Sequence, residues 1–299
     1  MNNQTEKIAY FHLPGLFEFY EFYKAFLAIY DAHPEYFYDW CKISSIYGSP
    51  EDCIWSGGRI EYSQVSPKKV LELTQKYNIS ARLTFSNSLL KKEHLNDLRC
   101  NDLCKLFNHF PHNGIIVHSD LLLNYLKETY PQLYFVSSTT KVITDFKEFI
   151  QELNRKEFKY VVPDFRLNKS FAQLQKLTPK QKGKVEFLCN ECCNIHCKER
   201  KKCYETVSKQ NLDESVEDHI CPYTNEGYRF SKAMENPSFI HLEDIQNIYL
   251  PMGFSNFKIE GRSLGSALIL EFLLYYLVKP KYHIHIREEL YLDNTLDLF

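Results

Sequence analysis

The residues best able to do chemistry are six cysteines in the second half of the chain. Five of the ten cysteines fall within the fifteen residues from Cys189 to Cys203, and Cys221 follows. No signal peptide is visible at the start of the chain, so we expect a cytoplasmic protein whose thiols stay reduced. Clustered thiols in such a protein indicate metal binding or redox chemistry rather than structural disulfides.

Thiolates bind zinc in four-coordinate sites and iron–sulfur clusters through four cysteines. The spacing here follows neither a zinc ribbon nor a ferredoxin. Cys189 shares a strand face with Val185 and Phe187 and is interpreted as a small core residue, while the adjacent Cys192 and Cys193 do not easily point to one spot. We therefore expect the metal ligands to be Cys193, Cys197, Cys203 and Cys221, with Cys192 and Cys189 in reserve.

The basic residues between these cysteines admit two interpretations. Lys198, Arg200, Lys201 and Lys202 would offset the negative charge of a metal cluster, or they would form a solvated face of the helix expected over 197–210. The metal itself also has two candidates. We expect a 4Fe–4S cluster, with zinc as the alternative.

Around the cysteines the chain repeats one pattern, in which a short β-prone run is followed by a turn and a helical stretch. Helices are predicted at 66–78, 91–110, 120–130 and 145–156, the last with Asp145 as its N-cap. Eight strands alternating with helices predict parallel βα units that close into a TIM-like (β/α) barrel. An open, doubly wound sheet is the competing α/β architecture, but no Gly-rich dinucleotide fingerprint follows the first strand. The predicted strands are 8–13, 41–48, 81–87, 114–120, 132–139, 159–165, 184–190 and 256–262.

We expect one domain over 1–299, with residues 189–236 as a cysteine-rich, metal-binding excursion after a late strand. In such a barrel the carboxyl ends of the strands line the active-site mouth. The residues at these ends are mostly polar or ionisable although the strands are apolar. They are Asn87, His118, Ser119, Asp120, Ser138, Thr139, Asp164, Arg166, Asn190, Glu191, Glu260 and Arg262.

The last predicted strand carries the sequence FKIEGR, from Phe257 to Arg262. Lys258 and Glu260 alternate with apolar residues, so both charges lie on one strand face, where they need partners or a ligand. Arg262 offers two parallel N–H donors for a carboxylate or phosphate. A structural ion network at the barrel end is the alternative.

This pentapeptide, KIEGR downstream of a cysteine block, resembles the collagenase-like peptidase family U-thirty-two (U32). The resemblance implies a TIM-type barrel. It also implies a 4Fe–4S cluster on four cysteines, as in members that support oxygen-independent hydroxylation of RNA bases or ubiquinone precursors. The cysteine spacing differs from that of the hydroxylase members, which indicates a divergent member.

Two further sequences follow earlier strands. In CIWSGGR, Gly57 and Gly58 can present backbone N–H groups to an anion beside Arg59, and Trp55 can stack on a planar ligand; a plain structural loop is the alternative. In VHSD, His118 is a candidate acid or base, while Ser119 and Asp120 are better explained as a helix start.

The C-terminal part holds the most apolar segment and a pair of histidines. Residues 264–278 are too short to span a membrane and carry Glu271, so a buried core helix is expected. His283 and His285 alternate with isoleucine, which we interpret as a surface hairpin. The formal net charge of −2 gives no reason to expect strong attraction to nucleic acid.

Together these features predict a metal-dependent barrel enzyme with a 4Fe–4S cluster, and the resemblance implies a redox modification such as oxygen-independent hydroxylation. The alternatives are a peptidase-like hydrolase and a non-enzymatic binding protein stabilised by zinc on the same thiols. The candidate partners are a substrate, an electron donor and a partner protein. The substrate is either a small molecule or a nucleic-acid base. Candidate catalytic residues are Glu260, Arg262 and His118, and candidate substrate-binding residues are Arg59, Trp55, Lys258, Asp164 and Arg166.

Overall fold

The computed structural model describes residues 7–58, 63–216, 219, 221, 229–261 and 265–296. Within them, eight parallel strands form one sheet. Each strand overlaps one of the eight predicted runs, so the strand prediction is confirmed. The strands are β1 (Ala9–Pro14), β2 (Cys41–Gly48), β3 (Ser80–Phe85), β4 (Gly114–Val117), β5 (Tyr134–Ser137), β6 (Phe158–Val161), β7 (Glu186–Leu188) and β8 (Asn256–Lys258).

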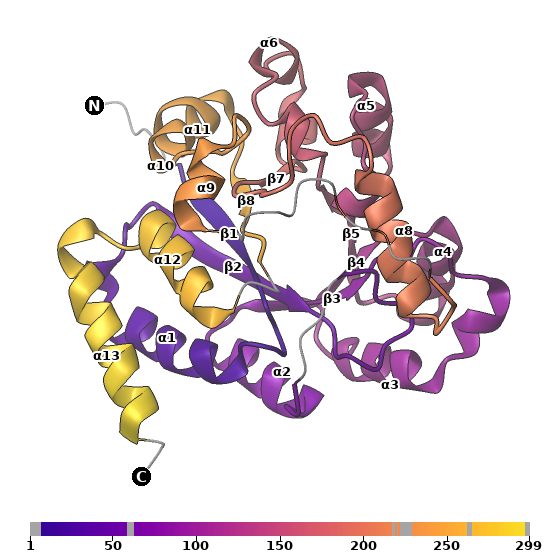
Figure 1. The fold of residues 1–299 in the computed structure, drawn as a ribbon, viewed down its shortest axis with the longest axis horizontal. Helices are drawn as coiled ribbons and strands as arrows, with labels where there is room; N and C mark the ends of the chain where they lie inside the picture. Colours follow the sequence, from indigo (N-terminus) through magenta and orange to yellow (C-terminus); the bar gives the residue numbers. More distant parts are fainter. Residues whose placement is uncertain are drawn as a thin grey trace.

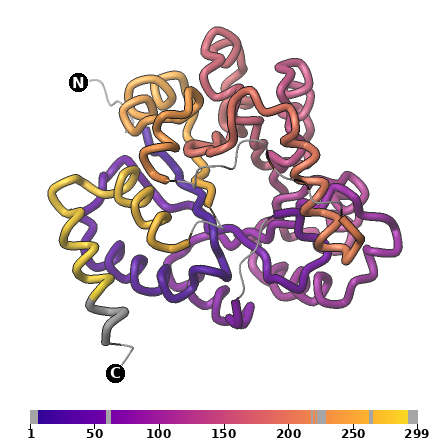
Figure 2. The backbone as a smooth tube through the Cα atoms, viewed as in Figure 1, coloured from indigo at the N-terminus to yellow at the C-terminus, as the bar shows by residue number. Residues whose placement is uncertain are grey.

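The strand order is β6-β5-β4-β3-β2-β1-β8-β7, which brings the last two strands next to the first. A parallel bridge between Val161 and Val185 joins the two ends of the sheet, and the Val161 N–H donates to the Lys184 carbonyl at 2.8 Å. The sheet is therefore a nearly closed barrel surrounded by helices (Figures 1 and 2). This confirms the expected TIM-like architecture.

Helices follow the strands and pack against the outside of the barrel. Asp145 caps α5 as predicted, because its carboxylate accepts the N–H groups of Lys147 and Glu148, and the Ser119 side chain caps α4. The longer helices are α1 (Tyr20–Ala32), α2 (Pro67–Lys76), α3 (Leu98–Phe107), α4 (Asp120–Thr129), α5 (Phe146–Asn154), α8 (Arg200–Gln210), α12 (Ser266–Leu277) and α13 (His283–Leu296).

Short helices fill several connections. The continuous helix predicted at 91–110 is divided into η2 and α3, because Asp97 starts a new helix by accepting the Cys100 N–H. The short elements are α6 (Phe171–Leu174), α7 (Pro179–Lys182), α9 (Phe230–Glu235), α10 (Leu242–Asp244), α11 (Leu250–Met252), η1 (Pro34–Tyr36), η2 (Lys92–Asn96), η3 (Thr139–Lys141), η4 (Phe165–Leu167), η5 (Ile245–Tyr249) and η6 (Pro280–Tyr282).

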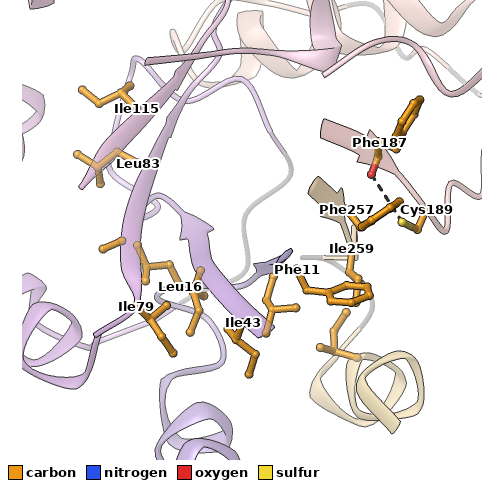
Figure 3. Close-up of a cluster of buried hydrophobic side chains, with 14 of the residues drawn as sticks. Phe11, Leu16, Ile43, Ile79, Leu83, Ile115, Phe187, Cys189, Phe257 and Ile259 are labelled. Atoms are coloured by element: carbon orange, nitrogen blue, oxygen red, sulfur yellow. Dashed lines mark hydrogen bonds between the residues drawn. The ribbon is translucent and has the colours of Figure 1, made fainter. Parts of the chain in front are cut away.

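The main hydrophobic core lies between strands and helices. Alternate strand residues such as Phe11, Leu83 and Phe257 are fully buried in it (Figure 3). Cys189 belongs to this core, where its thiol faces the Phe187 carbonyl at 3.6 Å. The interpretation of Cys189 as a small core residue is thus confirmed.

The barrel interior contains a buried charged cluster. Arg82 donates to Glu186 at 2.6 Å, and Lys258 Nζ lies 3.8 Å from the same carboxylate. His12 Nε2 lies 3.5 Å from Glu186, and His12 Nδ1 lies 2.8 Å from the Ser45 hydroxyl. Burial and then the Arg82 charge lower the pKa of His12 to about 3, so this imidazole is neutral at physiological pH.

Of the two predictions for the C-terminal part, the core helix is confirmed and the hairpin is wrong. Residues 264–278 do contain a buried core helix, α12. Within the described part of the chain, no helix is long and apolar enough to cross a membrane. The hairpin expected around His283 is wrong, because α13 begins at that residue. Helix-forming residues follow the short H-I-H-I alternation, and Arg287 binds Glu271 of α12 at 2.7 Å.

Candidate functional site

Two glutamates meet at the barrel mouth, Glu191 just after β7 and Glu260 just after the neighbouring β8. Asn190 aligns them, because its amide donates to the Glu260 carbonyl at 3.1 Å and accepts the Glu260 N–H at 2.8 Å. Glu191 and Glu260 hydrogen-bond to each other through their side chains. Both carboxyl groups also accept the Cys192 N–H, at 3.0 and 3.3 Å.

The two carboxyl groups are held in different protonation states. Burial would raise the pKa of Glu191, but Arg200 and the Cys193 N–H outweigh it and lower that pKa. Burial and the negative Glu191 raise the pKa of Glu260 to about 8. At neutral pH the pair therefore shares one proton, and such a pair can both donate and accept protons.

Arg200, the first residue of α8, is the cation of this site. Its guanidinium is buried and binds the carboxylate of Glu191, and its Nε lies 3.4 Å from Asp164 Oδ2. It also contacts the Tyr204 ring at 5.2 Å. Arg200 is therefore not part of a solvated helix face, whereas Lys201 and Lys202 are exposed.

Asp164 and Arg166, two predicted substrate-binding residues, tie the cysteine-rich segment to the end of β6. The Arg166 guanidinium donates to the carbonyls of Ile195, at 3.0 Å, and Cys197. Asp164 is fully buried between Arg166 and Arg200. In the structure both side chains are thus engaged within the protein.

The other end of the segment is fixed across the mouth. The Asn87 amide, after β3, donates to the Ser208 carbonyl at 3.0 Å, and Asn211 donates to the Ser56 carbonyl at 2.6 Å. At the β7 end of the segment, the Asn236 amide donates to the carbonyls of Glu191 and Cys193. The segment and α8 therefore extend from the β7 end to the loops after β2 and β3 (Figure 1).

The predicted metal ligands lie along this segment. Cys193 is half-buried beside Arg200 and close enough to Cys197 for their charges to interact; burial, the largest cause, raises the Cys193 pKa to about 12. Cys197 is buried and Cys221 is half-buried. Cys203, on α8, contacts His219, with 3.1 Å between Sγ and Nε2.

The spacing of these thiols can be compared with the ligand spacing of a zinc ion and of an iron–sulfur cluster. Among the described residues, the set of ligand atoms that all lie within 4.8 Å of one another belongs to Glu191, Cys192 and Glu260. The four predicted thiols form no such set, although the thiol ligands of a single zinc ion lie about 4 Å apart. An iron–sulfur cluster spreads its ligands further, because each thiolate binds a different iron. The close spacing that a single zinc ion requires is not seen for these four thiols among the described residues.

The remaining predicted residues do not join the carboxyl pair. Trp55 is fully buried, its Nε1–H donates to the His94 carbonyl at 2.7 Å, and its ring packs edge-on against Phe85. It therefore has no free face for a ligand, and the stacking prediction is wrong in this structure. Lys258 lies inside the barrel over the Tyr47 ring, and its Nζ lies 3.8 Å from the Glu186 carboxylate.

His118 directly follows β4, which lies four places from β8 around the ring of strands. Its Nδ1 lies 2.8 Å from the Thr140 hydroxyl, and burial followed by Lys141 lowers its pKa to about 4. It is thus on the opposite side of the mouth from Glu260. Arg59 and Arg262 lie outside the described residues.

Three residues of the site were not selected from the sequence. Glu191 was recognised as a strand end, and the signal that pairs it with Glu260 is that both follow neighbouring strands β7 and β8. Cys192 was held in reserve, yet its N–H bridges the two carboxyl groups. No local pattern marks Tyr204.

One comparison with known proteins bears on this geometry. The solved structure of the U32 peptidase Mk0906 is similar to the chain with a TM-score of 0.50 and 12% identity, over 87% of this chain and 96% of that one. The chain shares its fold with this U32 peptidase. No family model and no curated protein matches the sequence. The U32 resemblance drawn from KIEGR and the cysteines is therefore confirmed at the level of fold.

Proposed function

We propose that this U32-type barrel is an iron–sulfur enzyme with its cluster beside the Glu191–Glu260 pair at the mouth. The observation that carries the proposal is that the Cys193 thiol lies next to the Glu191 carboxylate and the same arginine. The Cys193 N–H donates to Glu191 at 3.0 Å, and the Arg200 guanidinium contacts both side chains. The reaction class is a redox modification, such as oxygen-independent hydroxylation of a small molecule or a nucleic-acid base.

The residues have separate roles in this proposal. The 4Fe–4S cluster would be held by Cys193, Cys197, Cys203 and Cys221 and would supply electron transfer. Arg200 offsets the negative charge of thiolates and of Glu191. Glu260, whose pKa is about 8, holds a proton at neutral pH that it can donate to substrate, while Glu191 accepts one.

Anaerobic purification of the full chain tests the proposal. The wild type is expected to be brown, to absorb near 400 nm and to contain about four irons per chain. Cys193→Ser is expected to lose iron, whereas Cys100→Ala, a buried position on α3, keeps it as the matched control. Equal iron in both variants contradicts the proposed ligand set.

A hydrolase is the second candidate, favoured by the carboxyl pair. Aspartic peptidases use two carboxyl groups that share one proton, and the similar solved structure is named a peptidase. Glu191 would accept a proton from water and Glu260 would protonate the leaving group. Cleavage of a peptide library by Cys193→Ser protein, abolished by adding Glu260→Gln, would replace the iron–sulfur proposal.

A further inference from the structure

The contact between Cys203 and His219 was not anticipated from the sequence. Cys203 lies in the first turn of α8, and His219 belongs to the chain that follows the helix. Their Sγ and Nε2 atoms are 3.1 Å apart, and both side chains are partly buried. Sixteen residues separate them along the chain, so helical spacing does not bring them together.

The chemistry of this contact depends on the state of the sulfur. A thiol can donate its proton to a neutral imidazole, but a metal-bound cysteine is a thiolate and can only accept. Next to a thiolate, the imidazole must therefore carry its proton on Nε2 and donate it. At 3.1 Å the two atoms are within hydrogen-bond distance of each other.

We infer that His219 is a positioning residue of the iron–sulfur site, which donates an Nε2–H hydrogen bond to the Cys203 thiolate. The inference rests on the proposed function. Hydrogen bonds to cluster sulfurs set the reduction potential, and outer hydrogen-bond partners also orient metal ligands. His219 therefore stabilises the reduced cluster, in which the sulfurs carry more negative charge.

The test uses anaerobically purified full chain and two measurements, iron per chain and reduction potential. His219→Ala is expected to keep its iron while the ratio of reduced to oxidised cluster at a given potential falls about tenfold, which is about 59 mV for a one-electron couple. His219→Gln, which retains an N–H donor, is expected to recover part of this change. His196→Ala, an exposed histidine of the same segment, serves as the matched control and should equal the wild type.

Three results would overturn the inference. If His219→Ala keeps the wild-type potential, the hydrogen bond does not act on the cluster. If His219→Ala loses iron and His219→Cys restores it, His219 is a ligand. If the wild type binds no iron, the proposed function fails first, and this outcome is distinguished from the others because it needs no His219 variant.

Discussion

The buried histidine of the barrel interior predicts a specific loss of stability in acid. The pKa of His12 is about 3 in the folded chain because of burial and the Arg82 charge, against 6.5 for an exposed histidine. The unfolded chain therefore binds a proton below pH 6.5 that the folded chain does not. Stability falls as pH decreases from 6.5 and levels off below about 3, at about 1.4 kcal/mol per unit of pH.

The size of the effect follows from the two pKa values. Two units below 6.5, at pH 4.5, His12 costs about 2.7 kcal/mol of unfolding free energy. Glu186 adds a smaller loss of about 0.4 kcal/mol at pH 4.5, because the charges around it outweigh burial and lower its pKa to about 2, while the unfolded carboxyl begins to bind a proton there. Other histidines also titrate, so the quantity to measure is the difference between wild type and a variant.

His12→Gln removes the titrating group while keeping a polar partner for Ser45. Urea unfolding gives the free energy of wild type and variant at pH 7 and pH 4.5. We expect the stability advantage of the wild type to shrink by about 2.7 kcal/mol between the two pH values. A difference that does not change with pH would refute the neutral, buried state of His12.

Further predictions concern the interior, a tight loop and the cysteine-rich segment. Glu186→Gln leaves two buried cations without their carboxylate and should cost about 3–5 kcal/mol in urea unfolding, whereas Glu271→Gln, in an exposed ion pair, should cost about 1 kcal/mol or less. Gly57→Ala should lower the melting temperature, because an added Cβ would lie 2.2 Å from the Ser86 carbonyl oxygen; an unchanged melting temperature would contradict that close approach. Arg166→Ala should speed amide exchange at 195–197, and unchanged exchange would show that other contacts hold the segment.

The fold could be predicted because its signals are local. Short apolar runs, turns and caps such as Asp145 recur along the chain, and each can be recognised within a few residues. The end of each strand then gave candidates for the mouth without any knowledge of contacts. Glu260 and Glu191 are both strand ends, so the position of the site followed from the barrel itself.

The contacts within the site could not be predicted in the same way. Arg200 meets Glu191 because an irregular segment turns back over the mouth, and no periodic pattern records that path. Asp164 and Arg166 looked like ligand-binding residues because they are polar strand-end residues, but the segment itself satisfies them. Trp55 lies just before Gly57, which the backbone after β3 approaches closely at Ser86, and its ring is buried against Phe85.

In the proposed function, thiolates and the Glu191–Glu260 pair surround one inorganic centre at the barrel mouth. An anomalous difference map at the iron edge, from crystals grown without oxygen, tests it most directly. We expect iron within bonding distance of the Cys193 and Cys197 sulfurs and beside the two carboxyl groups. A map without iron at the mouth, or with iron bound elsewhere on the chain, would contradict it.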